Sequence, residues 1–384
     1  MIINHSIRTR LAKNTTVYVS DVLNSYIKMP SIRNYNFNTN DKKYNSCLFC
    51  VTNTDDLASL FTFIFYHKVI CKFDKIVIAD NLSLLKIYNL TKVFDNVDYF
   101  DARLMKGQSD IYNKYLQYEN ESKYITFIDD DEFFYISDKY SNDINKFLES
   151  VNPEVSKIAI PWILIYSKSL LEKRTQNILE FSQYYCPDEE TYDLNNNIWT
   201  SNYIKTILNT TDTEHYFYND NSNLNVFKTL NQLYETNLID SLDNLDITPR
   251  SIGVNPKNEV FIDVMGTVHN PYSLKNKQIQ LVNDLCTNKK IVGIKRSETN
   301  EFYVNNSDIL LMHYKYRSIE EYSNKIAKSR FYDIDSNYYN VVFNLNYINK
   351  QYKKPLKTFD KIFNLFNKYK NEFNSLHSKL VNEY

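Results

Sequence analysis

The strongest chemical feature of this sequence is the acidic run Asp129–Glu132, which reads Asp-Asp-Asp-Glu. It follows the apolar segment Tyr124–Ile128 and precedes the apolar segment Phe133–Ile136. Acidic runs at protein surfaces usually lie in polar loops, whereas carboxylates crowded between two buried segments repel one another unless a cation neutralises them. The run therefore predicts a divalent-cation site, with a surface acidic turn as the alternative.

The spacing within the run favours a particular pair of ligands. In an extended strand end, Asp129 and Asp131 point to the same side and Asp130 points to the other. Two carboxylates in this Asp-x-Asp arrangement hold Mg²⁺ or Mn²⁺, which prefer oxygen ligands. Such a cation also binds the two phosphates of a nucleotide sugar and stabilises the departing diphosphate as a Lewis acid.

The composition limits how this protein could bind phosphate groups and nucleic acid. The chain of 384 residues has only 4 glycines and contains neither G-x-G-x-x-G nor G-K-[ST], so no glycine-rich loop cradles a phosphate. A divalent cation is the usual substitute. The net charge is −1 and no Lys/Arg stripe alternates with aromatic residues, so we expect no nucleic-acid partner.

The elements before the acidic run alternate between strands and helices. Such alternation predicts a doubly wound, mostly parallel sheet, in which ligands bind at the carboxyl ends of the strands. Asp80 and Asn81, like Asp129–Glu132, follow directly after a strand of this series. Asp56 and its neighbours supply an N-cap for the first helix. We expect strands at 47–51, 75–79, 97–100 and 124–128, and helices at 55–70, 84–94 and 109–121.

The pattern is less regular after the acidic run. Pro161 lies in the next expected strand and indicates an edge strand or a bulge. Residues 212–246 are rich in Asn and Asp and are typical of an insertion. Apolar residues at helical spacing predict one amphipathic C-terminal helix that docks on the protein's own core. The expected strands are 16–22, 157–165, 259–264 and 308–312, and the expected helices are 319–329 and 356–380.

The cysteines and the termini indicate a cellular compartment. Five scattered cysteines, an odd number, are typical of a reducing compartment. Cys47 and Cys50 lie in one apolar strand and should point to opposite faces, which favours a structural role over zinc or redox chemistry. The sequence has no signal-peptide core and no apolar run of membrane-spanning length, so we expect a cytoplasmic protein without a transmembrane segment.

Several motifs occur in the order typical of a known enzyme family. Residues 124–133 resemble the D-x-D-E-F signature of glycosyltransferase family 92 and related family-2-like enzymes. Asn53-Thr54 departs from that family's pattern, which has Asn-Glu there. Further segments similar to the family are Val51–His67, Ile76–Ser83, Gln108–Asn113, Ile158–Trp162 and Met312–Ser318.

The resemblance implies the GT-A fold, the nucleotide-diphospho-sugar transferase form of an α/β doubly wound sheet with helices on both faces, here followed by the C-terminal amphipathic helix. Residues 1–45 are expected to form an N-terminal arm and 46–330 the catalytic domain. That domain divides into a nucleotide-sugar half, 46–165, and an acceptor half, 166–330, with an insertion at about 208–258. Residues 331–384 form a C-terminal helical extension.

The resemblance also implies the activity of a metal-dependent hexosyltransferase. It transfers a sugar from a UDP-sugar, with UDP-galactose as the donor by analogy, to a glycan or glycoprotein acceptor with inversion, and uses Mn²⁺ or Mg²⁺. The alternative is a catalytically inactive carbohydrate- or partner-binding protein of the same fold, which the Asn53-Thr54 departure favours. A phosphatase is disfavoured because Thr52-Asn53, rather than a nucleophilic Asp, follows the first strand.

Site residues carry over from the family motifs one by one. The implied metal ligands are Asp129, Asp131 and His313. Glu132 is expected to orient the site or to contact the sugar. The implied donor-binding residues are Asn53, Asp80, Asn81, Gln108, Asp129, Lys315 and Arg317.

An inverting transferase also needs a carboxylate base for the acceptor hydroxyl. Glu180, Asp263 and Glu214 are available, and nothing in the sequence chooses among them. With Glu132, Glu180 and Asp263 form the expected catalytic set. Lys205 and His269 are weaker site candidates.

Overall fold

The computed structural model divides the chain into two compact units, Met1–Asp41 and Lys42–Tyr384, and only the second contains described residues. Between 42 and 167 it describes all residues except 55, 82, 84–86, 106–107, 119–120, 152 and 154. Beyond these it describes 177–180, 183–185, 191–193, 198–211, 215–216, 246–247, 251–254, 260–263, 272–273, 278–281, 307–316, 354–355 and 357–383. The strand expected at 16–22 and the helix expected at 319–329 lie outside the described residues.

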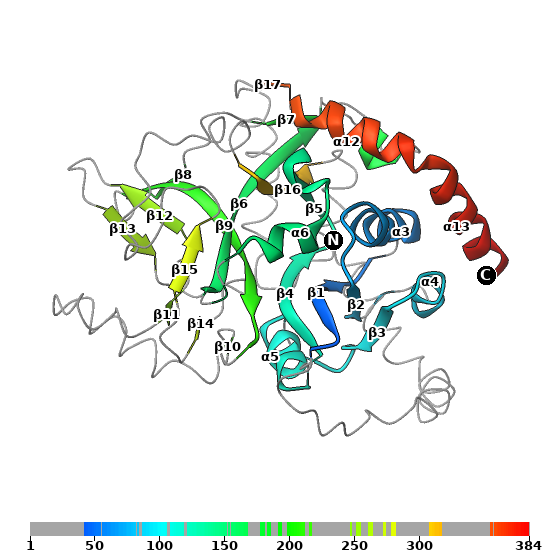
Figure 1. Ribbon diagram of the computed structural model, residues 1–384, viewed down its shortest axis with the longest axis horizontal. Coiled ribbons are helices and arrows are strands. Elements are labelled where there is room, and N and C mark those ends of the chain that lie inside the picture. The colour runs from blue at the N-terminus through cyan, green and yellow to red at the C-terminus, as the bar shows by residue number, and fades with distance from the viewer. Residues whose placement is uncertain are drawn as a thin grey trace, which may run out of the picture. The chain divides into compact units, whose positions relative to one another are not determined.

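Four parallel strands form the first half of the main sheet, in the order β3-β2-β1-β4 (Figure 1). Each coincides with a strand expected from the sequence, so the prediction of a mostly parallel sheet in this half is confirmed. The carboxyl ends of β1, β2 and β4 meet at one edge, where Thr52 pairs with Asp80 and Val51 pairs with Asp129. The strands are β1 (Tyr44–Thr52), β2 (Lys75–Asp80), β3 (Val97–Asp101) and β4 (Ser122–Asp129).

Helices connect these strands, as the alternating pattern predicts. The N-cap of the first is Asp56, whose side chain accepts a hydrogen bond from the Ser59 amide at 3.1 Å. The connector expected at 84–94 is described as helix only over four residues. The helices of this half are α3 (Leu57–Phe65) with its π-helical continuation η1 (Tyr66–Ile70), α4 (Tyr88–Thr91), α5 (Gln108–Tyr118), η2 (Asp138–Tyr140) and α6 (Ile144–Glu149).

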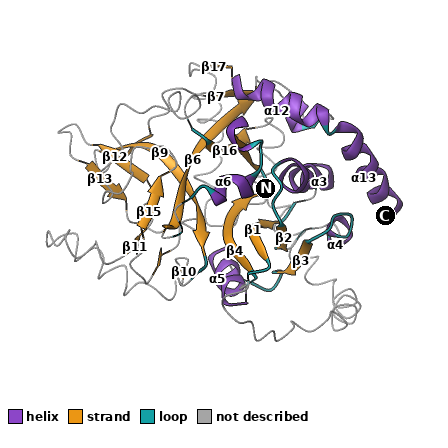
Figure 2. Ribbon diagram, in the orientation of Figure 1, coloured by secondary structure: helices purple, strands orange, loops and turns teal. Residues whose placement is uncertain are grey.

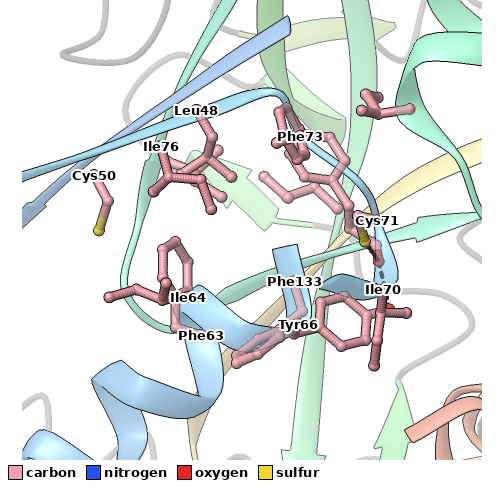
Figure 3. Packing of buried hydrophobic residues seen from close by; sticks show 14 of the residues in the cluster. Leu48, Cys50, Phe63, Ile64, Tyr66, Ile70, Cys71, Phe73, Ile76 and Phe133 are labelled. Atoms are coloured by element: carbon pink, nitrogen blue, oxygen red, sulfur yellow. Dashed lines mark hydrogen bonds between the residues drawn. The ribbon is translucent and has the colours of Figure 1, made fainter. Parts of the chain in front are cut away.

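The two faces of the sheet carry separate hydrophobic cores. Leu48, Cys50 and Ile76 face α3, as Figure 3 shows, whereas Cys47 and Phe49 lie in a second cluster with residues of α5. The prediction that Cys47 and Cys50 point to opposite faces is therefore confirmed. Full burial of one such apolar side chain contributes about 1.5–3 kcal/mol, so the two layers stabilise the four parallel strands.

The second half of the sheet brings antiparallel strands next to β4. Strand β9 (Ile198–Asn209) lies antiparallel between β4 and β6 (Val155–Ser167). Strand β16 (Ile309–Tyr316) pairs in parallel with β6 and antiparallel with β5 (Glu132–Ile136). The sequence predicts no strand at 198–209, because the pattern is less regular there. That interpretation is wrong for β9, which is a central strand although polar residues interrupt its apolar ones.

The remaining elements are short. They are η3 (Ile178–Glu180), β7 (Gln183–Tyr185), β8 (Thr191–Asp193), β10 (His215–Tyr216), β11 (Asp246–Ile247), β12 (Ser251–Val254), β13 (Val260–Asp263), β14 (Tyr272–Ser273), β15 (Gln278–Leu281) and β17 (Lys354–Pro355).

Pro161 does not mark a sheet edge, contrary to one of the two expectations for it. On one side β6 pairs with β9 through Pro161 itself, which lies opposite Ile204. On the other side, β15 pairs with β6 as far as Ala159 and β16 pairs with it from Trp162 onward. Pro161 thus occupies the change of partner, where the hydrogen-bond donor that proline lacks is not needed.

The C-terminal segment forms two helices, α12 (Lys357–Lys368) and α13 (Lys370–Glu383), instead of the single helix expected (Figure 2). The prediction that their apolar stripe docks on the protein's own core is confirmed. The Phe373 ring lies 5.1 Å from that of Phe61 and 5.0 Å from that of Phe65 in α3. Among the described helices, none combines the length and the apolar character that crossing a membrane requires.

His67, in η1, holds the helical layer to β5. Its Nδ1 lies 2.8 Å from the Phe63 carbonyl, and its Nε2 accepts the Phe134 amide at 3.3 Å. These contacts require a neutral ring with the proton on Nδ1. Burial lowers the pKa of His67 to about 3, although the hydrogen bond to Phe63 raises it.

This buried histidine predicts a loss of stability in acid. The pKa of His67 is depressed in the fold, so between about pH 6.5 and pH 3 only the unfolded chain takes up the proton. The free energy of unfolding should therefore fall by up to about 1.4 kcal/mol per pH unit in this range because of His67 alone. Urea unfolding at several pH values measures the slope, which should be shallower in His67→Gln. Equal slopes for wild type and His67→Gln would contradict this assignment.

Candidate active site

The acidic run forms a turn at the carboxyl edge of the sheet. Strand β4 ends at Asp129, residues 130 and 131 make the turn, and β5 begins at Glu132. The expected extended geometry is therefore wrong here, because alternation of side chains no longer applies once the strand has ended. The three aspartates instead contact three different parts of the fold.

Asp129 is held by two donors from distant elements. Its Oδ1 accepts a hydrogen bond from Gln108 Nε2 at 2.8 Å, and its Oδ2 lies 3.2 Å from Lys205 Nζ. Gln108 is the first residue of α5, and Lys205 belongs to β9. The Asp129 side chain is 28% exposed, so it can also contact a ligand at this edge.

Glu132 is the buried centre of the turn. The side chain is 0% exposed and accepts hydrogen bonds from the Asp129 amide at 2.9 Å and from Trp162 Nε1 at 2.7 Å. Lys205 Nζ completes the set at 2.8 Å. A carboxyl group without exposed surface has no access to an acceptor hydroxyl, so this geometry favours a role in holding the turn over a role as the base.

The charges of the turn are balanced from within the chain. Burial raises the pKa of the Glu132 carboxyl above its ordinary value, and the adjacent Lys205 ammonium limits that rise. Burial on its own lowers the pKa of Lys205, but the attraction of Asp129 and Glu132 outweighs it and leaves that pKa raised. Lys205 therefore stays charged and supplies part of the positive charge that neutralises the carboxylates of the turn.

Asp130 points back to the first strand. Its Oδ2 accepts a 2.6 Å hydrogen bond from the Thr52 hydroxyl, which in turn accepts the Thr54 amide at 3.2 Å. Thr52 is buried at the end of β1. This contact joins the acidic turn to the loop that follows β1.

Asp131 faces β16. Its Oδ1 lies 3.2 Å from His313 Nε2, and its backbone carbonyl accepts the Tyr314 amide at 2.8 Å. The two side chains are 6% and 7% exposed. The His313 ring stacks on Trp162 with its centroid 4.6 Å away. The acidic turn and β16, which are far apart in the sequence, thus place one carboxylate and one imidazole side by side.

This pair fits a cation with few protein ligands. Bonds of about 2.1 Å at right angles, as around octahedral Mg²⁺, place neighbouring ligand atoms about 3 Å apart. The Oδ1–Nε2 distance of 3.2 Å is compatible with that spacing. Within the described part of the chain, no group of three His, Cys, Asp or Glu side chains is arranged to hold a metal ion. Asp129 therefore does not join Asp131 and His313 in one ligand set, and a cation here would complete its shell with water and substrate oxygens.

Asp80 lies two strands from Asp129 on the same edge. It is buried, and its oxygens accept the Ser83 amide at 2.8 Å and the Tyr99 hydroxyl at 3.0 Å. The Asn81 amide donates to the Thr52 carbonyl at 2.8 Å. The structure thus brings together the ends of β1, β2 and β4, as the sequence predicted for a ligand edge.

The other expected site residues fall into three groups. Asn53 is exposed in the loop after β1. Glu180 ends η3, Asp263 ends β13 and Lys315 lies in β16, but their side chains lie outside the described part of the structure. Glu214, His269 and Arg317 lie outside the described residues altogether.

Sequence reasoning undervalued Lys205 and missed Trp162 and Thr52. Lys205 did carry a signal, because it interrupts the run Ile204–Leu208, where a lysine in a buried strand calls for an acidic partner. The indole contact with Glu132 and the Thr52 contact with Asp130 join residues far apart in sequence. Only the register of the strands reveals them.

The Thr52 hydroxyl should contribute to stability. Thr52→Val removes the donor to Asp130 and the acceptor for the Thr54 amide, with little change of shape. We expect a loss of about 1–2 kcal/mol in the free energy of unfolding, because the partly buried Asp130 carboxylate and Thr54 amide both lose this hydrogen bond. Thr52→Ser, which keeps the hydroxyl, is the control and should lose less. Chemical denaturation measures both, and equal stability of Thr52→Val and wild type would refute the role of this contact.

No family model and no curated protein matches this chain. Among solved structures, the chain is similar to the S. aureus TarS fragment 1–349, with 11% sequence identity and a TM-score of 0.25. The match spans 43% of this chain and 47% of that one. A likeness at this TM-score carries no argument about fold or function.

Proposed function

We propose that this protein is a glycosyltransferase that moves a hexose from a nucleotide sugar to a glycan or glycoprotein acceptor with the help of Mn²⁺ or Mg²⁺. One observation carries the proposal: Asp131 Oδ1 and His313 Nε2 lie 3.2 Å apart beside an acidic turn at the carboxyl edge of a parallel sheet. In open α/β sheets this edge is where ligands bind.

The sheet supports the doubly wound α/β form that the family resemblance implies. Parallel strands in the order β3-β2-β1-β4 continue into antiparallel β9 and then β6, so that the acidic turn lies where the two halves of the sheet meet. Residues 124–133, which resemble the family signature, form the end of β4, the acidic turn and the start of β5 at this junction. Fold analogy alone does not identify the sugar, so UDP-galactose is proposed only as the first donor to test.

The side chains at the carboxyl edge of the sheet could each contact a different part of a nucleotide sugar. Asp131 and His313 would hold the cation, which offsets the charge of the diphosphate as it leaves. Asp129, partly exposed and fixed by Gln108 and Lys205, is suited to accept hydrogen bonds from the hydroxyl groups of the donor. Asp80 would contact the base or the ribose.

Inversion requires attack from the opposite side of the sugar. The acceptor hydroxyl oxygen bonds to the anomeric carbon as the bond to the diphosphate breaks, and a carboxylate base takes the hydroxyl proton. Glu180, Asp263 and Glu214 remain the candidates for that base. Because Glu132 is fully buried, one of these three carboxylates is the better candidate for the base.

The proposal predicts that Asp131→Asn abolishes sugar transfer without unfolding the protein. Loss of a charged cation ligand should reduce turnover by at least about 100-fold. Release of UDP from UDP-sugars in the presence of Mn²⁺ measures it. Asp138→Asn, an exposed aspartate paired with Lys361, is the matched control and should keep full activity. Undiminished turnover by a folded Asp131→Asn protein would rule out this site.

Nucleotide binding should raise thermal stability only with the cation. At a hundredfold excess of ligand over its dissociation constant, binding to the folded state adds about 2.7 kcal/mol. We expect this shift for UDP with Mn²⁺ and a much smaller one for either alone. A shift with GDP or CMP would mean that the donor carries that nucleotide in place of UDP. A shift without any turnover would favour the inactive binding protein. No shift with any nucleotide would contradict the proposed donor site.

A further inference from the structure

Lys205 is a buried ammonium that contacts both Asp129 and Glu132 of the site. Its ammonium is 5% exposed, lies 2.8 Å from Glu132 Oε2 and 3.2 Å from Asp129 Oδ2, and comes from a strand of the other half of the sheet. A fully buried lysine is rare unless it is paired, and this one pairs with two carboxylates at the edge where ligands bind.

The position of Lys205 follows from strand register. In β9, Lys205 lies opposite Ile160 of β6, and Ile207 lies opposite Ile158. Ile158, Ile160 and Ile207 all belong to the core cluster on the α3 side of the sheet. Directly opposed residues share a face, so Lys205 extends from an otherwise apolar face toward the acidic turn.

The two contacts of Lys205 serve different purposes. Glu132 is wholly buried and also binds the Asp129 amide and the Trp162 indole, so its pairing with Lys205 offsets a charge inside the protein. Asp129 is partly exposed at the ligand edge, so its pairing with Lys205 fixes the direction of a carboxylate that a ligand can reach. Gln108 fixes the other oxygen of Asp129 at 2.8 Å.

We infer that Lys205 is a positioning residue of the donor site, which orients Asp129 for the nucleotide sugar in addition to compensating the charge of buried Glu132. This inference rests on the proposed function. With Asp129 already paired to the ammonium, the exogenous cation is confined to Asp131 and His313. Lys205 acts through Asp129 and contacts no donor atom itself.

A double substitution separates the two purposes. Lys205→Met alone leaves the buried Glu132 uncompensated and should destabilise the fold. Adding Glu132→Gln removes that charge and should restore part of the stability, whereas Asp129 still lacks its partner. We therefore expect Lys205→Met/Glu132→Gln to bind UDP with Mn²⁺ at least tenfold more weakly than Glu132→Gln alone, with the affinities measured by calorimetry on folded protein.

A second buried lysine provides the matched control. Lys75 begins β2, at the opposite end of the strand from Asp80, and pairs with Glu121 at 3.0 Å. Lys75→Met should lower the melting temperature and leave the affinity for UDP with Mn²⁺ unchanged. If Lys205→Met/Glu132→Gln does not fold, Lys205→Gln/Glu132→Gln, which keeps a neutral donor at position 205, takes its place with the same expected loss of affinity.

The outcomes are distinct. Equal affinity of the double variant and Glu132→Gln would overturn the inference and leave Lys205 a purely structural residue, with the proposed function intact. A wild-type protein that binds no nucleotide with Mn²⁺ would overturn the proposed function, and the inference with it. Weaker binding in the double variant, together with unchanged binding in Lys75→Met, supports the positioning role.

Discussion

An ammonium buried among carboxylates holds this site together. Lys205 lies within 3.2 Å of both Asp129 and Glu132, at the point where the parallel half of the sheet meets its antiparallel half. Acidic groups so close together would repel one another and open the turn without a positive charge. Removing one partner of a buried pair of this kind costs about 3–5 kcal/mol, so the conformation of the turn depends on it.

The packing around the turn explains why its parts reach one place. The helix α3 and the C-terminal helices cover one face of the sheet, and α5 covers the other, so each strand end arrives at the edge in a fixed direction. His67 binds the Phe134 amide of β5, two residues after Glu132, and so holds η1 to this strand. The acidic turn is therefore a rigid feature of the core, and its partly exposed carboxylates are oriented before any ligand arrives.

The sequence predicted the parallel half of the fold well because its strands are short apolar runs separated by amphipathic helices. It located the acidic run and placed Asp80 on the same edge, since both follow directly after buried strands. It failed at β9, where Thr200, Ser201 and Asn202 interrupt the apolar pattern of a strand whose neighbours make it central. It also predicted one continuous C-terminal helix, although the helix is interrupted at Tyr369.

The side-chain contacts of the site could not be predicted from the sequence, for a physical reason. The contacts Lys205–Glu132, Trp162–Glu132 and His313–Asp131 each join the acidic turn or β5 to another strand. Such contacts depend on strand register, and a shift of one residue would turn every side chain to the other face. The sequence indicates that Lys205 needs an acidic partner, but it does not identify Asp129 and Glu132 as that partner.

We propose that Asp131 and His313 hold a divalent cation that binds the diphosphate of a nucleotide. Anomalous scattering from Mn²⁺ in crystals grown with UDP tests this proposal, because it locates the ion itself. We predict one Mn²⁺ peak within bonding distance of Asp131 Oδ1 and His313 Nε2, with diphosphate oxygens completing its shell. A peak bound to other residues, or UDP bound at this edge without Mn²⁺, would contradict it.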